Sequence, residues 1–105
     1  MTKGIALLAP ASIKWEIGNA LSVMFKKGRI TLDEAKEVWD ICMDIPLQHV
    51  DVDPVRSLEI SFKGDLYAYD AYMIVCCLER KAPLLTLDKA LLEKANFFNV
   101  PTEVV

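Results

Sequence analysis

Three acidic residues, Glu16, Asp70 and Asp88, occupy positions from which carboxylates can do chemistry. At about 100° per residue, Glu16 lies beside Ile13 and Ala20, at the edge of an apolar helical stripe. Asp88 comes directly after a short apolar run, at the carboxyl end of an expected strand. Sites in parallel sheets form beyond these strand ends, so we expect the three acids on one rim of a sheet.

Asp70 is the acid with the most apolar surroundings. Its neighbours at helical spacing are Leu66, Met73, Ile74 and Cys77, and no lysine or arginine lies three or four residues away. Burial of an unpaired carboxylate is costly, so Asp70 needs a cation, hydrogen bonds or a raised pKa. A cluster of carboxylates without cationic partners suits Mg²⁺ or Mn²⁺, which can activate water for phosphodiester hydrolysis.

Two of these acids also have a purely structural interpretation. Asp88 could cap the helix expected over residues 89–96, a role that is compatible with metal ligation. Glu16 could lie at the surface if its helix is rotated slightly. A purely structural interpretation is hardest to support for Asp70, because its neighbours on the helix are apolar.

Composition limits the class of protein. The chain has 105 residues, which predicts a single domain spanning residues 1–105. Hydrophobic residues make up 53% and charged residues 26%, which excludes a disordered chain, and the net charge of −3 excludes a strongly basic nucleic-acid coat. No apolar run is long enough to cross a membrane. Three cysteines without a CxxC pair, and no signal-peptide pattern, favour a reduced cytoplasmic protein.

Strand-like and helical segments alternate along the chain. Apolar runs predict strands over residues 4–9, 47–52, 83–87 and 100–105. Helices are expected over residues 12–27, 32–42, 54–63, 66–80 and 89–96, with capping signals at Thr31, Asp53 and Asp65. Strands separated by helices predict an α/β fold, a parallel β-sheet flanked by helices.

Basic and aromatic side chains carry weaker signals. Lys26, Lys27 and Arg29 form a dense basic patch that could contact an RNA backbone, although a solvated helix end is the simpler interpretation. The aromatic residues are expected in the core and at interfaces rather than as base-stacking platforms: Trp15, Trp39, Tyr67, Tyr69 and Tyr72. The single histidine, His49, has no acid–nucleophile companion.

Three segments together resemble the PIN-domain ribonucleases, and most closely the VapC-type toxins of prokaryotic toxin–antitoxin pairs. They are Ala9-Pro10 with the stretch from Trp15 to Leu21, the Tyr69-Asp70-Ala71-Tyr72 segment, and the run from Leu84 to Asp88. The resemblance implies a PIN-like three-layer fold that binds Mg²⁺ or Mn²⁺ and hydrolyses RNA. It assigns catalysis and metal binding to Glu16, Asp70 and Asp88, with Asn19 and Thr86 in supporting positions. It also implies an RNA substrate and a possible antitoxin protein as partners.

The chain departs from this family at its N-terminus. PIN domains begin with a strand that carries a first acid, whereas residues 4–9 align with the second family strand, so we expect an N-terminally truncated fold. Asp51, Asp53 and Asp65 are possible substitutes for the first acid, without a positional argument for any of them. The strands beside the gap could close onto each other, or another chain could cover them, and the apolar content favours a homo-oligomer.

Two functions follow from the sequence. The first is a metal-dependent endoribonuclease of the PIN type. The alternative is a catalytically degenerate PIN-like module that acts through dimerisation or protein binding. A nucleotide-binding fold of the flavodoxin type has less support, because no glycine-rich loop follows any strand.

Overall fold

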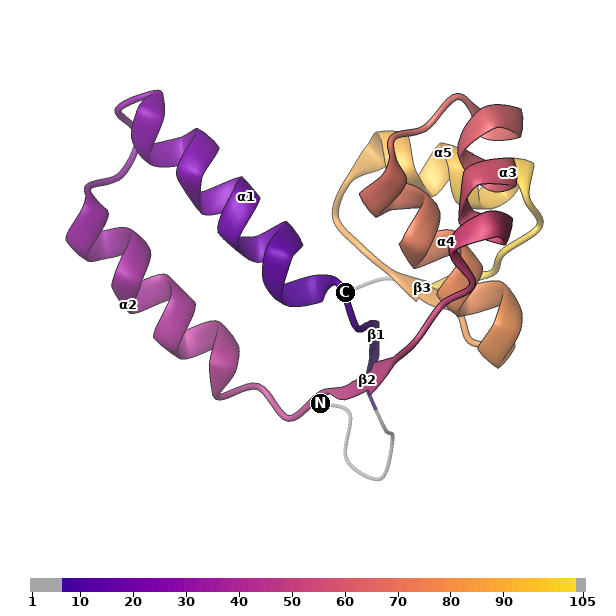
Figure 1. Cartoon of the computed structure of the whole chain (residues 1–105), viewed down its shortest axis with the longest axis horizontal. Coiled ribbons are helices and arrows are strands. Elements are labelled where there is room, and N and C mark those ends of the chain that lie inside the picture. The colour runs from indigo at the N-terminus through magenta and orange to yellow at the C-terminus, as the bar shows by residue number, and fades with distance from the viewer. Residues whose placement is uncertain (1–6, 104–105) are drawn as a thin grey trace. The chain divides into compact units, whose positions relative to one another are not determined.

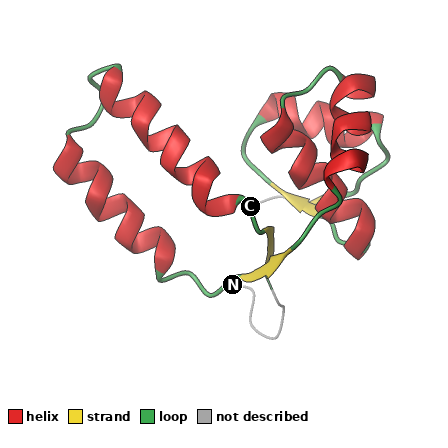
Figure 2. Cartoon of the chain, in the orientation of Figure 1, coloured by secondary structure: helices red, strands yellow, loops and turns green. Residues whose placement is uncertain are grey.

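The computed structural model describes residues 7–103 and divides the chain into two compact units, residues 1–49 and 50–105. Its elements are β1 (Leu8–Pro10), α1 (Ile13–Lys26), α2 (Leu32–Met43), β2 (Gln48–Val50), α3 (Pro54–Gly64), α4 (Ala68–Arg80), β3 (Leu84–Leu85), α5 (Lys89–Phe97) and β4 (Thr102–Glu103) (Figures 1 and 2). Within the described residues, five helices therefore alternate with short strands, which confirms the predicted α/β class.

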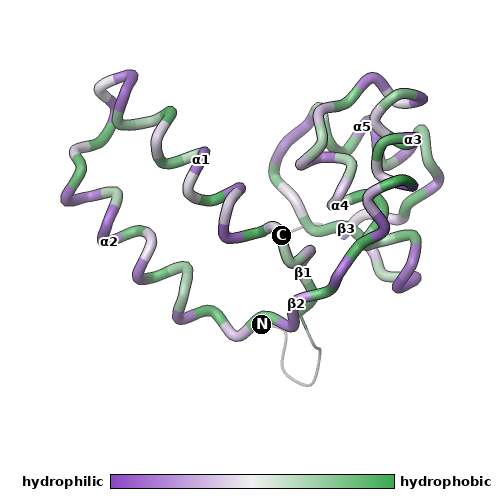
Figure 3. The backbone as a smooth tube through the Cα atoms, in the orientation of Figure 1, coloured by the Kyte–Doolittle hydropathy of each residue, from purple (hydrophilic) through white to green (hydrophobic). Residues whose placement is uncertain are grey.

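The first unit is built on two helices, α1 and α2, that pack against each other (Figure 1). The predicted capping box starts α2: Glu34 N–H donates to Thr31 Oγ1 at 3.1 Å, and Thr31 N–H donates to Glu34 Oε1 at 2.9 Å. Gly28, which follows the C-cap residue of α1, has a φ of 71°, a left-handed conformation that glycine adopts without strain. Hydropathy alternates along both helices, as their amphipathic pattern requires (Figure 3).

The strands pair two by two. β1 pairs with β2, and Gln48 N–H donates to the Leu7 carbonyl oxygen at 2.9 Å. β3 and β4 run parallel, with Leu84 opposite Thr102 and Leu85 opposite Glu103. Each strand is shorter than predicted, and residues 4–6, 104 and 105 of the predicted strands lie outside the described residues.

Two local signals fix the ends of α3. Asp53 begins it as predicted, since its Oδ1 accepts a hydrogen bond from Val55 N–H at 3.0 Å, with Pro54 at the first helical position. At the other end, a Cβ at Gly64 would stand 2.6 Å from the Phe98 ring, so only glycine allows this close approach.

The prediction that Asp65 caps the next helix is wrong. Asp65 instead closes α3 in the left-handed conformation, with φ of 54°. Leu66 is tied to the end of the same helix, because its N–H donates to the Ser61 carbonyl oxygen at 3.0 Å. α4 therefore starts two residues later than predicted, with Tyr67 as its N-cap.

The core of the second unit is centred on α4, which packs against α3 and β3. Ala71, Ile74 and Val75 have no exposed surface, and Cys76 and Cys77 are buried beside them. Residues of α3, β3, α5 and the segment after α5 complete the cluster, including Ile60, Leu84, Leu91, Ala95 and Val100. The cysteines are core residues, as the sequence predicts, and burial raises the pKa of the Cys77 thiol to about 11.

Between residues 7 and 103, no helix combines the length and the apolar character needed to cross a membrane.

Candidate carboxylate site

Asp70 stands in the first turn of α4, at the third helical position after Tyr67. Its side chain is half-buried, and the following residue, Ala71, is completely buried. The apolar pattern of α4 thus carries this carboxylate to the edge of the core. The sequence predicts that environment correctly.

Asp88 is fixed by short-range hydrogen bonds at the start of α5. Its Oδ1 accepts from the N–H groups of Ala90 and Leu91, at 2.9 and 3.3 Å. Thr86 Oγ1 in turn accepts from Asp88 N–H at 3.1 Å. The helix cap that the sequence offers as a structural role for Asp88 is therefore formed, and Thr86 supports the backbone of this acid.

The two carboxylates interact. Burial raises the pKa of Asp70 above its usual range, and the negative charge of Asp88 raises it further. Within the described residues, the one ion pair joins Arg56 to Glu79, at 3.8 Å, so no lysine or arginine neutralises Asp70 or Asp88. Among residues 7–103, these two carboxylates therefore form no ion pair with a lysine or arginine.

This arrangement predicts a pH dependence for the unfolding free energy. The pKa of Asp70 is higher in the folded state than its ordinary value of 3.8, so the folded protein binds this proton more tightly than the unfolded chain. Stability should therefore fall as the pH rises through the interval between the two values. We expect carbon-13 NMR titration of the Asp70 carboxyl to give the raised pKa, and Asp88→Asn to lower it. A titration of Asp70 that is the same in both proteins would contradict the interaction.

Glu16 and the other predicted residues of the first unit lie on α1 or just after it. Ser12 Oγ donates to Glu16 Oε2 at 2.8 Å, and the Glu16 side chain is half-buried. Asn19 is exposed, and its carbonyl oxygen accepts from Ser22 Oγ at 2.7 Å. The participation of Glu16 and Asn19 in the site stays a prediction, because they belong to the other compact unit.

The basic patch lies at the end of α1. Lys26 is in the last turn, Lys27 caps the helix, and Arg29 follows, all with exposed side chains. Cations in this position interact favourably with the helix dipole, so the structural interpretation of the patch is satisfied. The same exposure leaves these side chains accessible to a phosphate backbone.

Among residues 7–103, no group of three or more His, Cys, Asp or Glu side chains is arranged to hold a metal ion. All three cysteines are free thiols, and the raised pKa of Cys76 and of Cys77 keeps both protonated near neutral pH. The described residues therefore offer carboxylate chemistry rather than a thiolate nucleophile in α4.

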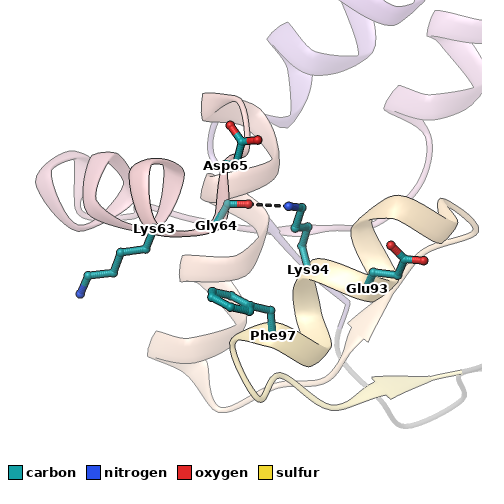
Figure 4. A pocket seen from close by; sticks show the side chains of 6 residues that line it. All are labelled: Lys63, Gly64, Asp65, Glu93, Lys94 and Phe97. Atoms are coloured by element: carbon teal, nitrogen blue, oxygen red, sulfur yellow. Dashed lines mark hydrogen bonds between the residues drawn. The ribbon is translucent and has the colours of Figure 1, made fainter.

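A shallow pocket of about 350 Å³ lies at the far end of α5 from Asp88 (Figure 4). It is lined by Lys63, Gly64, Asp65, Glu93, Lys94 and Phe97. Lys94 Nζ donates to the Gly64 carbonyl oxygen at 2.6 Å, which satisfies the C-terminal end of α3. Lys94 thus has a structural role in this pocket, and the carboxylate pair stays the stronger candidate site.

Three of the aromatic side chains predicted in the core or at interfaces are exposed. Tyr67 is 90% exposed, and Trp15 and Tyr69 are also exposed, so a core location is wrong for these three and an interface location stays a prediction. A residue at the N-cap stands outside the apolar stripe of its helix, and placing the helix start at Ala68 would have revealed this.

A scan against models of known protein families finds no match to this chain, and a search of curated proteins finds none either.

Proposed function

We propose that this protein is a metal-dependent endoribonuclease of the PIN or VapC toxin type, which hydrolyses RNA phosphodiester bonds at an acidic Mg²⁺ or Mn²⁺ site. The observation that carries the proposal is the pair Asp70–Asp88. Burial and the negative charge of Asp88 raise the pKa of Asp70, and no lysine or arginine among the described residues forms an ion pair with either acid.

A hard divalent cation fits this pair of residues. Mg²⁺ takes oxygen ligands, and it is commonly held by one or two carboxylates together with waters and substrate phosphates. When bound, such an ion polarises the phosphate and supplies a nucleophilic hydroxide at neutral pH. A cation would also remove the repulsion that now raises the pKa of Asp70.

The protein's own side chains have separate tasks in this proposal. Asp88 is held by its cap through Oδ1, and within the described residues Oδ2 takes no hydrogen bond, so this oxygen is available to a cation. Thr86 fixes the backbone of Asp88. Asp70 must lose its proton to bind the ion, so metal affinity should rise with pH.

The remaining parts of the proposal rest on the sequence resemblance. Glu16 would be the third metal-binding acid, supported by Asn19, and the exposed cations at the end of α1 would contact the RNA backbone. A PIN-like three-layer fold, an antitoxin protein as partner and a homo-oligomeric state belong to the same proposal.

The experiment is RNA cleavage by the purified 105-residue chain. We expect cleavage of a fluorescent RNA in Mn²⁺ or Mg²⁺, none in EDTA, and Mn²⁺ binding by calorimetry that disappears in Asp70→Asn. Asp70→Asn removes one charge with little change in volume, so the folded state should persist, as circular dichroism would verify. Cleavage that continues unchanged in the Asp70→Asn/Asp88→Asn double variant would rule the proposal out.

A second candidate is a protein-binding module, favoured by the outward face of α3. Val55, Leu58 and Phe62 recur at helical spacing on this face, and the Phe62 ring is 89% exposed. An apolar stripe of this kind is typical of a helix that binds another protein. Light scattering on the purified chain tests it: an assembly that dissociates in Phe62→Ser, without any RNA cleavage by the parent chain, would favour this function.

A further inference from the structure

We propose that the α1–α2 hairpin is the surface through which two copies of this chain associate, as a four-helix bundle in which α1 of each copy packs on α2 of the other. The inference deepens the homo-oligomeric state within the proposed function by naming its interface, and it needs no assumption about RNA. Its basis is an apolar face on a hairpin whose two helices carry opposite charge.

The hairpin leaves nearly all of its apolar side chains at least partly exposed. The helices α1 and α2 pack against each other, and each has one buried residue, Leu21 in α1 and Ala35 in α2 (Figure 1). Two helices side by side form a single layer, and an amphipathic layer needs a second layer to bury its apolar side. A second helical hairpin supplies that layer in a four-helix bundle.

Each helix carries an apolar stripe with the same spacing of three and then four residues. The members of the two stripes are Ile17, Ala20 and Met24 on α1, and Val38, Ile41 and Ile45 on α2 and the turn after it. Ile41 is 65% exposed and Ile45 is 46% exposed. The Ile45 N–H donates to the Cys42 carbonyl oxygen at 3.2 Å, so the helical turn extends to this residue. Alternation of three and four residues is typical of helices that pack on other helices in bundles.

Both stripes lie on the same side of the hairpin. Leu21 and Ala35 mark the sides on which the two helices meet. At about 100° per residue, each stripe lies about a quarter of a turn from that buried residue, in the same rotational sense. Because the helices run antiparallel (Figure 1), the same rotation brings both stripes to one side of the plane of their axes. The hairpin therefore presents one continuous apolar face.

The two helices that carry this face differ in charge. Residues 13–29 contain four basic side chains and one acid, whereas residues 32–44 contain five acids and one lysine. A partner complements the face when it places an acidic helix over α1 and a basic helix over α2. A second copy of the hairpin, related by a twofold axis parallel to the helices, presents this arrangement. The face is thus complementary to itself, as a symmetric dimer interface must be.

The charges also select between the two twofold arrangements that bring these faces together. An axis parallel to the helices sets α1 of one copy antiparallel to α2 of the other. An axis perpendicular to the helices, in the plane between the copies, sets α1 on α1 and α2 on α2, with like charges opposed. Attraction between unlike helices therefore favours the first arrangement, and it should weaken as salt screens the charges.

The first test measures the dimer dissociation constant of the purified 105-residue chain by sedimentation equilibrium. We expect Ile41→Ser to raise this constant by at least about a hundredfold, because each dimer loses two buried isoleucine side chains. Ile41 is largely exposed within one copy, so the variant should stay folded, as circular dichroism would verify. Trp15→Ser is the matched control and should stay within about twofold of the parent. Trp15 is 68% exposed, about half a turn round α1 from its apolar stripe.

The second test varies the salt concentration. Between about 0.05 and 0.5 M NaCl, we expect the dissociation constant of the parent chain to rise by about three- to tenfold, since unlike charges face each other. A dissociation constant that falls over this range would mean that like helices are opposed, and it would overturn the proposed pairing of α1 with α2.

Three further outcomes would overturn the interface itself. The first is a parent chain that remains monomeric at about 0.1 mM, where a dimer of micromolar affinity would be nearly complete. The second is a dimer that Ile41→Ser leaves intact. The third is an assembly that Phe62→Ser dissociates and Ile41→Ser does not, which would place the contact on the outward face of α3.

RNA cleavage in Mn²⁺ by the same samples separates this inference from the ribonuclease function. A chain that cleaves RNA as a monomer retains the ribonuclease function and loses the hairpin interface. A chain that dimerises through Ile41 but never cleaves RNA retains the interface and loses the ribonuclease function.

Discussion

Asp88→Asn is expected to lower metal-dependent RNA cleavage by at least about a hundredfold while leaving the fold intact. Stabilisation of transition-state charge by a bound metal amounts to several kcal/mol, and a hundredfold corresponds to about 2.7 kcal/mol. The asparagine oxygen can still accept the N–H groups of Ala90 and Leu91 that Asp88 accepts now, at 2.9 and 3.3 Å. The unfolding free energy should therefore stay within about 0.5 kcal/mol of the parent, or rise slightly because repulsion of Asp70 is removed.

Two further variants separate the charge of Asp88 from its capping role. Asp88→Ala removes both, so it should lose cleavage and also about 1 kcal/mol of stability in urea unfolding. Glu59→Gln removes one exposed negative charge from the middle of α3 and should change neither quantity. If Asp88→Asn cleaves as fast as the parent, the charge of Asp88 has no role in the reaction.

Ile74→Ala is expected to have the largest effect on stability, a loss of about 2–5 kcal/mol of unfolding free energy. Ile74 has no exposed surface and lies at the centre of the cluster formed by α3, α4, β3 and α5. The lost methyl groups remove apolar burial and leave a cavity that the surrounding helices fill only partly. Urea denaturation monitored by circular dichroism measures the change. It should be a large part of the total, because the unfolding free energy of natural proteins is commonly only about 5–15 kcal/mol.

The matched control is Leu58→Ala, which removes a similar volume from the outward face of α3. Leu58 is 67% exposed, so its substitution should cost no more than about 0.5 kcal/mol. A loss of equal size in Leu58→Ala and Ile74→Ala would mean that the α3 face is covered in solution by another protein surface. The second candidate function would then gain support.

The sequence alone determined where most helices begin and end. The Thr31–Glu34 capping box and the Asp53-Pro54 start are formed as predicted, and the Asp88 cap, which the sequence offers as an alternative role for this acid, is also formed. Each is a hydrogen bond between residues two or three positions apart, so it depends on local residue types. The half-buried position of Asp70 was also predictable, since it follows from the periodicity of one helix.

Only the tertiary structure decided the features that join distant segments. Asp70 and Asp88 are eighteen positions apart in sequence (88 − 70), and their interaction depends on how α4 and the end of β3 pack. From its sequence context, Asp65 is predicted to cap the next helix. In the structure, Phe98 packs against Gly64 and Leu66 N–H donates to the Ser61 carbonyl oxygen, so α3 ends at this point and α4 starts later. That delay puts Tyr67 outside the helix and leaves its ring in water. Strands of two or three residues carry little periodic signal, so the pairing of Leu84 with Thr102 and of Leu85 with Glu103 could not be predicted from sequence. Local hydrogen bonds depend on residues a few positions apart and can be predicted from sequence, whereas burial and electrostatic interaction depend on which distant segments pack together.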